Sequence, residues 1–299
     1  MRTPSVAAAV AAALLVAGPT VHASDRDLDQ QVAADPHGIV EISNFSGRVE
    51  VSGWDQPQVS VHSVNPSDNV TVELSGGHSH TSITVRSHGM WGGGGEADLR
   101  IKIPRGSELD VTGVSSDITT DGILGMQRLK TVSGRIKADF AAADVEAKTV
   151  SGDVRLIGAG KPVEMHLSSI SGSIRLEHGA GEVDATTVSG DLNVQLDPAR
   201  SVRTRNTSGR TVIQGSLTKD ADLDAQSVSG DVKLHASAQG GYEYEVSTFS
   251  GSIHNCFNQE SERVNRYGPG ERLNGTRDKG SGHVRLKTMS GQIDICDKP

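Results

Sequence analysis

Pairs of carboxylates separated by a single residue recur along this sequence. Asp222 precedes Asp224 in this way, and Glu243 precedes Glu245. Alternate residues of a strand point to the same side, so each pair could bind a divalent cation or serve as the two acids of a glycosidase. The pairs return at one position of a repeated unit, however, and a repeated position does not mark a single catalytic centre. They define a candidate acidic stripe: Asp144, Glu146, Glu164, Glu182, Asp184, Asp222, Asp224, Glu243 and Glu245.

This acidic stripe has two interpretations. It could bind divalent cations or a cationic partner, or it could be a solvated face whose carboxylates oppose edge-to-edge aggregation. We favour the solvated face. Cations recur at another position of the repeat, which predicts a rod with one acidic and one basic flank; they are Lys137, Arg155, Arg175 and Lys233.

Other residue types that carry chemistry do not form a convincing site. His78, His80 and His88 lie near a run of four glycines, but no cysteine or carboxylate stands at a companion spacing for a metal. The Gly-x-Ser-x-Gly elbow of hydrolases is absent. The serine of the repeated Ser-Gly is too frequent to be a nucleophile, and a hydrogen bond at a corner explains it better. We predict no catalytic residue, no metal site and no cofactor.

The repeated unit is Thr-apolar-Ser-Gly-x-apolar-x-apolar. Its period is 18 to 21 residues, except for a last spacing of 40, and Ser116 takes the glycine position in a degenerate copy. Such a period is the signature of a solenoid, in which one supersecondary unit stacks on the next. The other copies are centred on Gly134, Gly152, Gly172, Gly190, Gly209, Gly230, Gly251 and Gly291.

Apolar residues occupy fixed positions counted from this glycine: −7, −5 and −2 before it, and +2 and +4 after it. Each half therefore resembles a strand with one buried face. The change of parity between −5 and −2 predicts a corner that keeps the −2 residue inside. Stacked coils would pair their strands in parallel. We predict an all-β, single-stranded parallel β-helix, a β-solenoid, in preference to a sandwich of antiparallel hairpins.

The chain divides into four predicted segments. Residues 1–23 have the charged start, apolar run and small-residue cleavage site of a signal peptide. A flexible segment 24–37 follows, and 38–106 contains a first coil plus a strand-rich cap or insertion. Residues 107–299 hold the repeats, with an excursion at about 257–280. We expect an exported protein, periplasmic, secreted or at the cell surface, because no later run is long enough for a transmembrane segment.

The two cysteines occupy the same position of two repeats. Cys256 follows Gly251 by five residues, and Cys296 follows Gly291 by five. If those two coils are neighbours, the cysteines lie about 4.8 Å apart, within the range for a disulfide. An oxidising compartment permits the bond. We predict a disulfide that staples the last coil.

The repeats, together with Val40–Asp55 and Ile101–Gly106, resemble the bacterial putative-adhesin family of exported β-strand-repeat proteins. The likeness covers about residues 38–297. It implies a right-handed β-helix in the cell envelope and supplies no catalytic residues. The excursion and the cysteine pair depart from simpler members.

Two classes of function fit these observations. The formal net charge of −8 gives no basic surface for nucleic acid. The first class, which we favour, is a non-enzymatic envelope adhesin or scaffold that presents flat strand faces to a surface polymer, a protein partner or a copy of itself. The alternative is a carbohydrate-binding or carbohydrate-active β-helix enzyme, which would gain support if both long excursions walled one groove.

Overall fold

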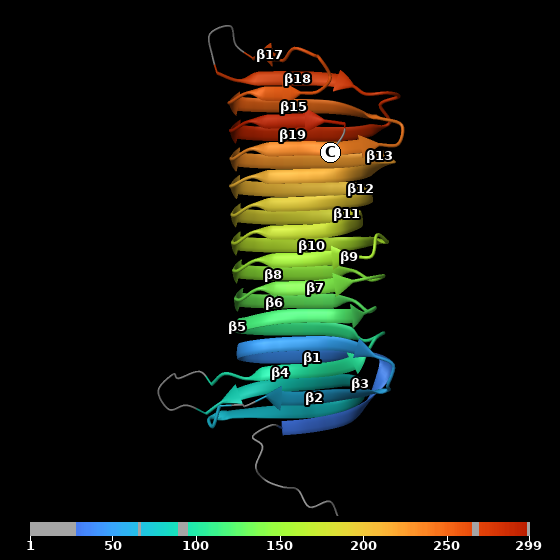
Figure 1. The fold of residues 1–299 in the computed structure, drawn as a ribbon, viewed down its shortest axis with the longest axis vertical. Helices are drawn as coiled ribbons and strands as arrows, with labels where there is room; N and C mark the ends of the chain where they lie inside the picture. The colour runs from blue at the N-terminus through green and yellow to red at the C-terminus, as the bar shows by residue number, and fades with distance from the viewer. Residues whose placement is uncertain (1–27, 65–66, 89–94, 265–268, 298–299) are drawn as a thin grey trace, which may run out of the picture.

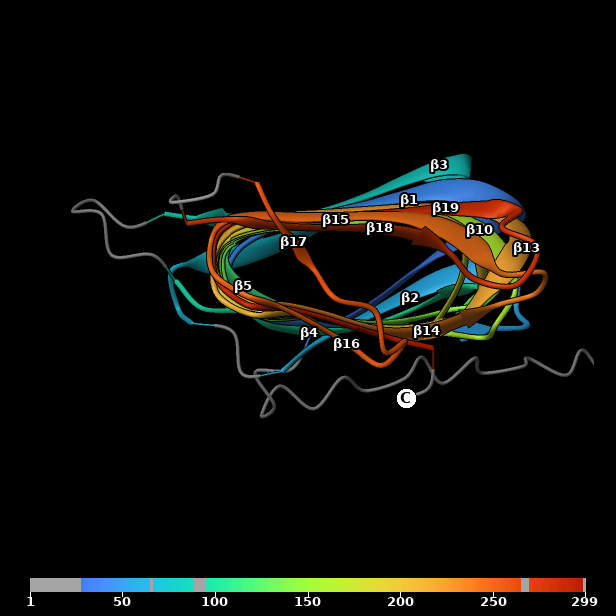
Figure 2. The ribbon, with the colours of Figure 1, turned by 90° about the horizontal axis from the view of Figure 1, so that it is seen from above.

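The computed structural model describes residues 28–64, 67–88, 95–264 and 269–297, which form a rod-shaped β-solenoid (Figure 1). Twenty strands make one continuous sheet that winds around a narrow core. Viewed along the rod, each coil is a flattened oval with two long faces (Figure 2). The predicted signal peptide, residues 1–23, lies outside the described residues. Within them, no segment is a helix that could span a membrane.

The body of the rod consists of parallel strands that pair equivalent positions of successive coils. Thr131 pairs with Thr149, for example, and Ile174 pairs with Leu192. The all-β prediction of stacked coils is confirmed, because every pairing among these body strands is parallel. The strands are β5 (Glu108–Ile123), β6 (Gln127–Ser133), β7 (Ile136–Phe140), β8 (Val145–Ser151), β9 (Val154–Gly158), β10 (Pro162–Ser171), β11 (Ile174–Ser189), β12 (Leu192–Ser208), β13 (Thr211–Ser229) and β14 (Val232–Ala238).

The N-terminal end is built from β1 (Leu28–Trp54), β2 (Gln58–Val64), β3 (Val70–Ser87) and β4 (Asp98–Pro104). One side of β1 pairs in parallel with β5, and the other side pairs with β3 and β4. The first coil therefore lies one layer inside the rod, and β3 and β4 form the layer outside it.

The beginning of β1 corrects one prediction. Residues 28–37 are not a flexible lead, because they are the first part of this strand. Residues 28–33 pair antiparallel with β2, which engages one edge of their backbone in hydrogen bonds. Ala34 is buried, and Val32 packs against the core.

The C-terminal end is built from β15 (Tyr242–Ser250), β16 (Ile253–Asn255), β17 (Glu262–Arg263), β18 (Glu271–Thr276), β19 (Gly282–Ser290) and β20 (Ile293–Cys296). Strand β19 pairs with β13 on one side and with β15 on the other. Strand β20 is likewise held between β14 and β16. The last coil in the sequence is thus inserted between the two coils that precede it. The excursion predicted at 257–280 contains β17 and β18, and β18 covers β15 as an antiparallel edge strand.

The core is filled by small and branched side chains at alternate positions. In one coil, Val145, Ala147, Val154 and Leu156 are all at most 1% exposed. Val and Ile have few χ1 rotamers and suit a narrow interior between two sheets, which accounts for a core with few aromatic residues.

The position of the corner corrects a second prediction. The −2 residue is not inside: Val150 is 43% exposed, whereas Thr149 at −3 is buried. The strand continues straight through −3, where the Thr149 hydroxyl donates a hydrogen bond to the Gly134 carbonyl of the neighbouring coil. The corner follows at the glycine. There an added Cβ on Gly152 would overlap the carbonyl oxygen of Gly134, which explains why the repeat requires glycine.

Two candidate binding surfaces

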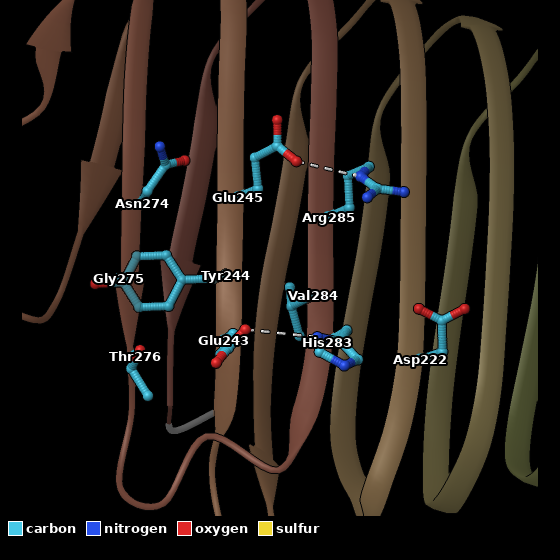
Figure 3. A pocket seen from close by; sticks show the side chains of 10 residues that line it. All are labelled: Asp222, Glu243, Tyr244, Glu245, Asn274, Gly275, Thr276, His283, Val284 and Arg285. Carbon is cyan, nitrogen blue, oxygen red and sulfur yellow. Dashed lines mark hydrogen bonds and ion pairs between the residues drawn. The ribbon is translucent and has the colours of Figure 1, made fainter.

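A polar cleft of about 750 Å³ lies on one long face, near the C-terminal end of the rod (Figure 3). Its side chains come from β13, β15, β18 and β19, so the inserted coil and the antiparallel edge strand both contribute to it. The lining residues are Asp222, Glu243, Tyr244, Glu245, Asn274, Gly275, Thr276, His283, Val284 and Arg285.

One ion pair and one contact between a carboxylate and an imidazole cross neighbouring coils in this cleft. Glu245 lies 3.4 Å from Arg285, and Glu243 lies 3.8 Å from His283. Asp222 is exposed, and its register partner on the inserted coil is His283. In Figure 3 these groups stand on the outer side of adjacent strands. The cleft therefore combines carboxylates and a guanidinium with the amide of Asn274 and the hydroxyl of Thr276.

The two glutamates of the cleft project from the same strand toward the same side, because they are alternate residues. A glycosidase places its two acids on opposite sides of the bond that it cleaves. The long excursions also lie apart, since β2–β4 cover one end of the rod and β17–β18 cover the other (Figure 1). They do not wall a common groove.

The predicted acidic stripe is divided between two rows, at positions −8 and −6; arginines interrupt the row at −6, and cations at other positions pair with members of both rows. Glu146 contacts Lys148 and lies 3.8 Å from Lys130. A hydrogen bond from Lys148 lowers the pKa of Glu146. Further pairs join Glu182 to Arg200 and Asp184 to Arg203. This face carries mixed charge, which reduces the repulsion between stacked carboxylates.

One cluster of three residue types that bind metals occurs in the described part of the chain: His235, Asp294 and Cys296. Cys296 forms the predicted disulfide with Cys256, with a Cα–Cα distance of 5.0 Å. Its sulfur is therefore not a thiolate. The histidines near the glycine run lie apart from this cluster, and His78 and His80 face Asp35 and Glu41.

A polar network reinforces the disulfide. Asp297, next to Cys296, accepts hydrogen bonds from the Tyr242 hydroxyl at 2.7 Å and from Arg277 at 2.8 Å. Burial, together with this hydrogen bond, raises the pKa of Tyr242, so its hydroxyl remains a donor. The network joins the inserted coil, the outer coil and the excursion.

The second candidate surface is a row of exposed apolar side chains at position −2, which we term the apolar ladder. Nine of its ten members are apolar and between 40% and 69% exposed. Strand register places them side by side along the rod, over about 43 Å at 4.8 Å per coil. In stacking order they are Phe45, Val114, Val132, Val150, Ile170, Val188, Thr207, Val228, Met289 and Phe249.

A groove of about 620 Å³ runs beside the C-terminal half of this ladder. One wall is formed by Val188, Val228, Met289 and Phe249, and the other wall includes Arg205 and Lys287 at position −4. We name it the ladder groove. Sequence reasoning missed it because the corner predicted between −5 and −2 would have kept the apolar −2 residues inside.

Comparison with known proteins places this architecture in a family. The model of the Toastrack DUF4097 family matches residues 39–241 and 206–296. No curated protein matches the chain. A solved structure from Clostridium sporogenes, described as a "putative cell adhesion protein", is 12% identical, with coverage of 91% of this chain and 100% of that one and a TM-score of 0.25. A "putative lipid binding protein" from Parabacteroides distasonis is 11% identical, with coverage of 90% and 96% and a TM-score of 0.35.

Both TM-scores are below 0.5, so neither likeness carries an argument about this chain. The family match spans nearly all the described coils and confirms the resemblance noted in the sequence. The chain belongs to the Toastrack DUF4097 family.

Proposed function

We propose that this protein is a non-enzymatic binding scaffold of the cell envelope, which holds a surface polymer or a protein partner on a flat strand face. The polar cleft is the observation that carries this proposal. It gathers three carboxylates, a guanidinium, an amide and a hydroxyl on an open face. These are the groups that fix hydroxyl-rich or polar chains by several hydrogen bonds.

Binding without turnover is the better fit to this geometry. Glu243 and Glu245 lie on the same side of any chain placed across them; Glu245 is paired with Arg285, and Glu243 lies beside the His283 imidazole. A carbohydrate-active enzyme is the alternative. Export through the signal peptide at 1–23 and the right-handed sense of winding are parts of the same proposal.

A glycan array followed by a reducing-sugar assay on each bound glycan tests this function. We expect binding with no release of reducing ends. Glu245→Gln should weaken binding at least fivefold, because it removes a charged partner of Arg285. Asp184→Asn is the matched control: Asp184 occupies the same repeat position, pairs with Arg203 and lies outside the cleft. Release of reducing ends, or equal weakening by both variants, would contradict the proposal.

A further inference from the structure

The apolar ladder is accompanied by a row with a distinct charge. Position −4 lies on the same outer face, two residues before the ladder. It contains four cations and no carboxylate, on a chain with a net charge of −8. We name this the basic row; in stacking order position −4 is Ser43, Thr112, Lys130, Lys148, Ser168, Thr186, Arg205, Gln226, Lys287 and Ser247.

The four cations differ in their surroundings. Lys130 and Lys148 both reach Glu146, so their charges are compensated. Arg205 and Lys287 line the ladder groove, and neither makes an ion pair within the described part of the chain. By contrast, Arg203 and Arg285, each two residues earlier, pair with carboxylates. The groove thus has one apolar wall and two uncompensated cations.

This combination selects the chemistry of an occupant. Apolar side chains left in water favour an apolar partner, and free cations favour an anion. An extended peptide laid along the rod would repeat its side chains every 6.6–6.8 Å or so, out of step with rungs about 4.8 Å apart. An alkyl chain has no such period. The groove spans five coils, or about 19 Å, which accommodates a long acyl chain.

We propose that the ladder groove binds a monomeric, single-chain anionic lipid. The acyl chain lies along Val188, Val228, Met289 and Phe249, and the anionic headgroup contacts Arg205 and Lys287. This site is separate from the polar cleft, so it stands or falls independently of the proposed function.

Titration of the chain with 16-carbon lysophosphatidylglycerol below its micelle concentration, followed by calorimetry, tests the headgroup contact. We expect saturable binding of one lipid per chain. The double variant Arg205→Gln and Lys287→Gln should weaken it at least tenfold. Lys130→Gln with Lys148→Gln, in the same row but outside the groove, should leave it unchanged. Lysophosphatidylcholine of equal chain length should bind more weakly to the wild type and be insensitive to both double variants.

A second pair of variants tests the acyl contact. Val228 and Val132 hold the same repeat position and are both 47% exposed, but only Val228 lines the groove. Val228→Ser should weaken binding of both lipids several-fold, whereas Val132→Ser should not. Because both residues are exposed, unchanged melting temperatures would verify the fold.

Three results of the lipid titrations would overturn this proposal. They are the absence of saturable binding to monomeric lipid, binding only to anionic vesicles, and equal weakening by Val228→Ser and Val132→Ser. The last two would assign the whole ladder to a membrane surface instead. Association of the chain with itself through the ladder, without lipid binding, would overturn it as well.

Discussion

Each end of the rod has a strand edge that must be covered, and the chain covers it in a different way at each end. At the N-terminal end, β1 forms the first coil, and the chain then leaves outward to build β2–β4 over it. At the C-terminal end, the chain first builds the outer coil and its β17–β18 cover, and then returns to insert β19 and β20 beneath them. The first coil and the last coil therefore each lie one layer inside, and another segment of the chain covers each exposed strand edge.

The difference between the ends lies in what holds the layers together. The first coil is part of β1, one strand of 27 residues whose beginning belongs to the N-terminal cover. The inserted coil begins at Gly282, after the excursion that follows the outer coil, and the disulfide and the Asp297 network tie it back to the outer coil. The covalent cross-link lies at the end where the inner coil follows its cover in the sequence. The predictions below test this asymmetry.

The largest expected effect is the loss of the disulfide. Cys256→Ser with Cys296→Ser should destabilise the oxidised protein by about 4 kcal/mol, from the entropy of a 40-residue loop. Hydrogen exchange should show faster opening of β15–β20, with β1–β4 unchanged. Uniformly faster exchange along the rod would mean that the ends are not independent.

Alanine substitutions at the glycine corner test whether the inserted coil is packed as tightly as the body of the rod. Gly230→Ala places a Cβ against the Gly209 carbonyl, and Gly291→Ala places one against Gly230. Each should cost about 3 kcal/mol or more in the free energy of unfolding by denaturant, since backbone must move. Ser229→Ala, next to the corner and exposed, should change it by less than about 0.5 kcal/mol. A tolerated Gly291→Ala would mean that the last coil is loosely seated.

The polar networks of the two ends should differ in strength. Asp297→Ala removes a carboxylate that accepts from two partly buried donors, and should cost about 1–2 kcal/mol. At the other end Asp29 pairs with His62 at 2.7 Å, but its side chain is 75% exposed. Asp29→Ala should therefore cost less than about 1 kcal/mol. Thermal unfolding of both variants measures the contrast, and equal losses would contradict it.

The smallest effect concerns a carboxyl group in the body, between the two ends. Burial raises the pKa of Asp139, and Asp121 on the neighbouring coil adds to the increase. A raised pKa means that the folded state binds the proton more tightly, so the contribution to stability is present at low pH and is lost as the pH rises through the folded pKa.

Asp139→Asn should accordingly stabilise the protein at neutral pH, by less than about 1 kcal/mol after allowance for solvent screening. The free energy of unfolding of this variant should also lack the pH dependence that the Asp139 carboxyl group contributes. A destabilising effect at pH 7 would show that the charged form of Asp139 is favoured in the fold.

The body of the rod was predictable because its information is local. Each repeat carries its own in-and-out pattern, and the shared position of Cys256 and Cys296 predicts that the two residues lie over one another if their coils are neighbours. The polar cleft was only partly predictable: Glu243 and Glu245 stood out as a pair, but Asn274 and Thr276 reach the cleft through an antiparallel strand without repeat character.

Stacking order and the apolar ladder were not predictable by the same reasoning. Any copy of the repeat can stack on any other, so the sequence pattern alone does not say that the Gly291 coil lies between those of Gly230 and Gly251. The prediction of a corner between −5 and −2 also failed. Thr149 at −3 is buried, because a hydroxyl with a carbonyl partner is as acceptable inside as an apolar residue.

The stacking order at the C-terminal end can be tested directly by moving one cysteine. His235 occupies the position equivalent to Cys256 and Cys296, and pairs with Cys296 in the register of β14 and β20. In His235→Cys with Cys256→Ser, we predict a disulfide to Cys296. In His235→Cys with Cys296→Ser, the two thiols lie two coils apart, about 9.6 Å, and should remain free. Intact-mass analysis after thiol alkylation of both variants would contradict the inserted coil if the disulfide formed only in the second.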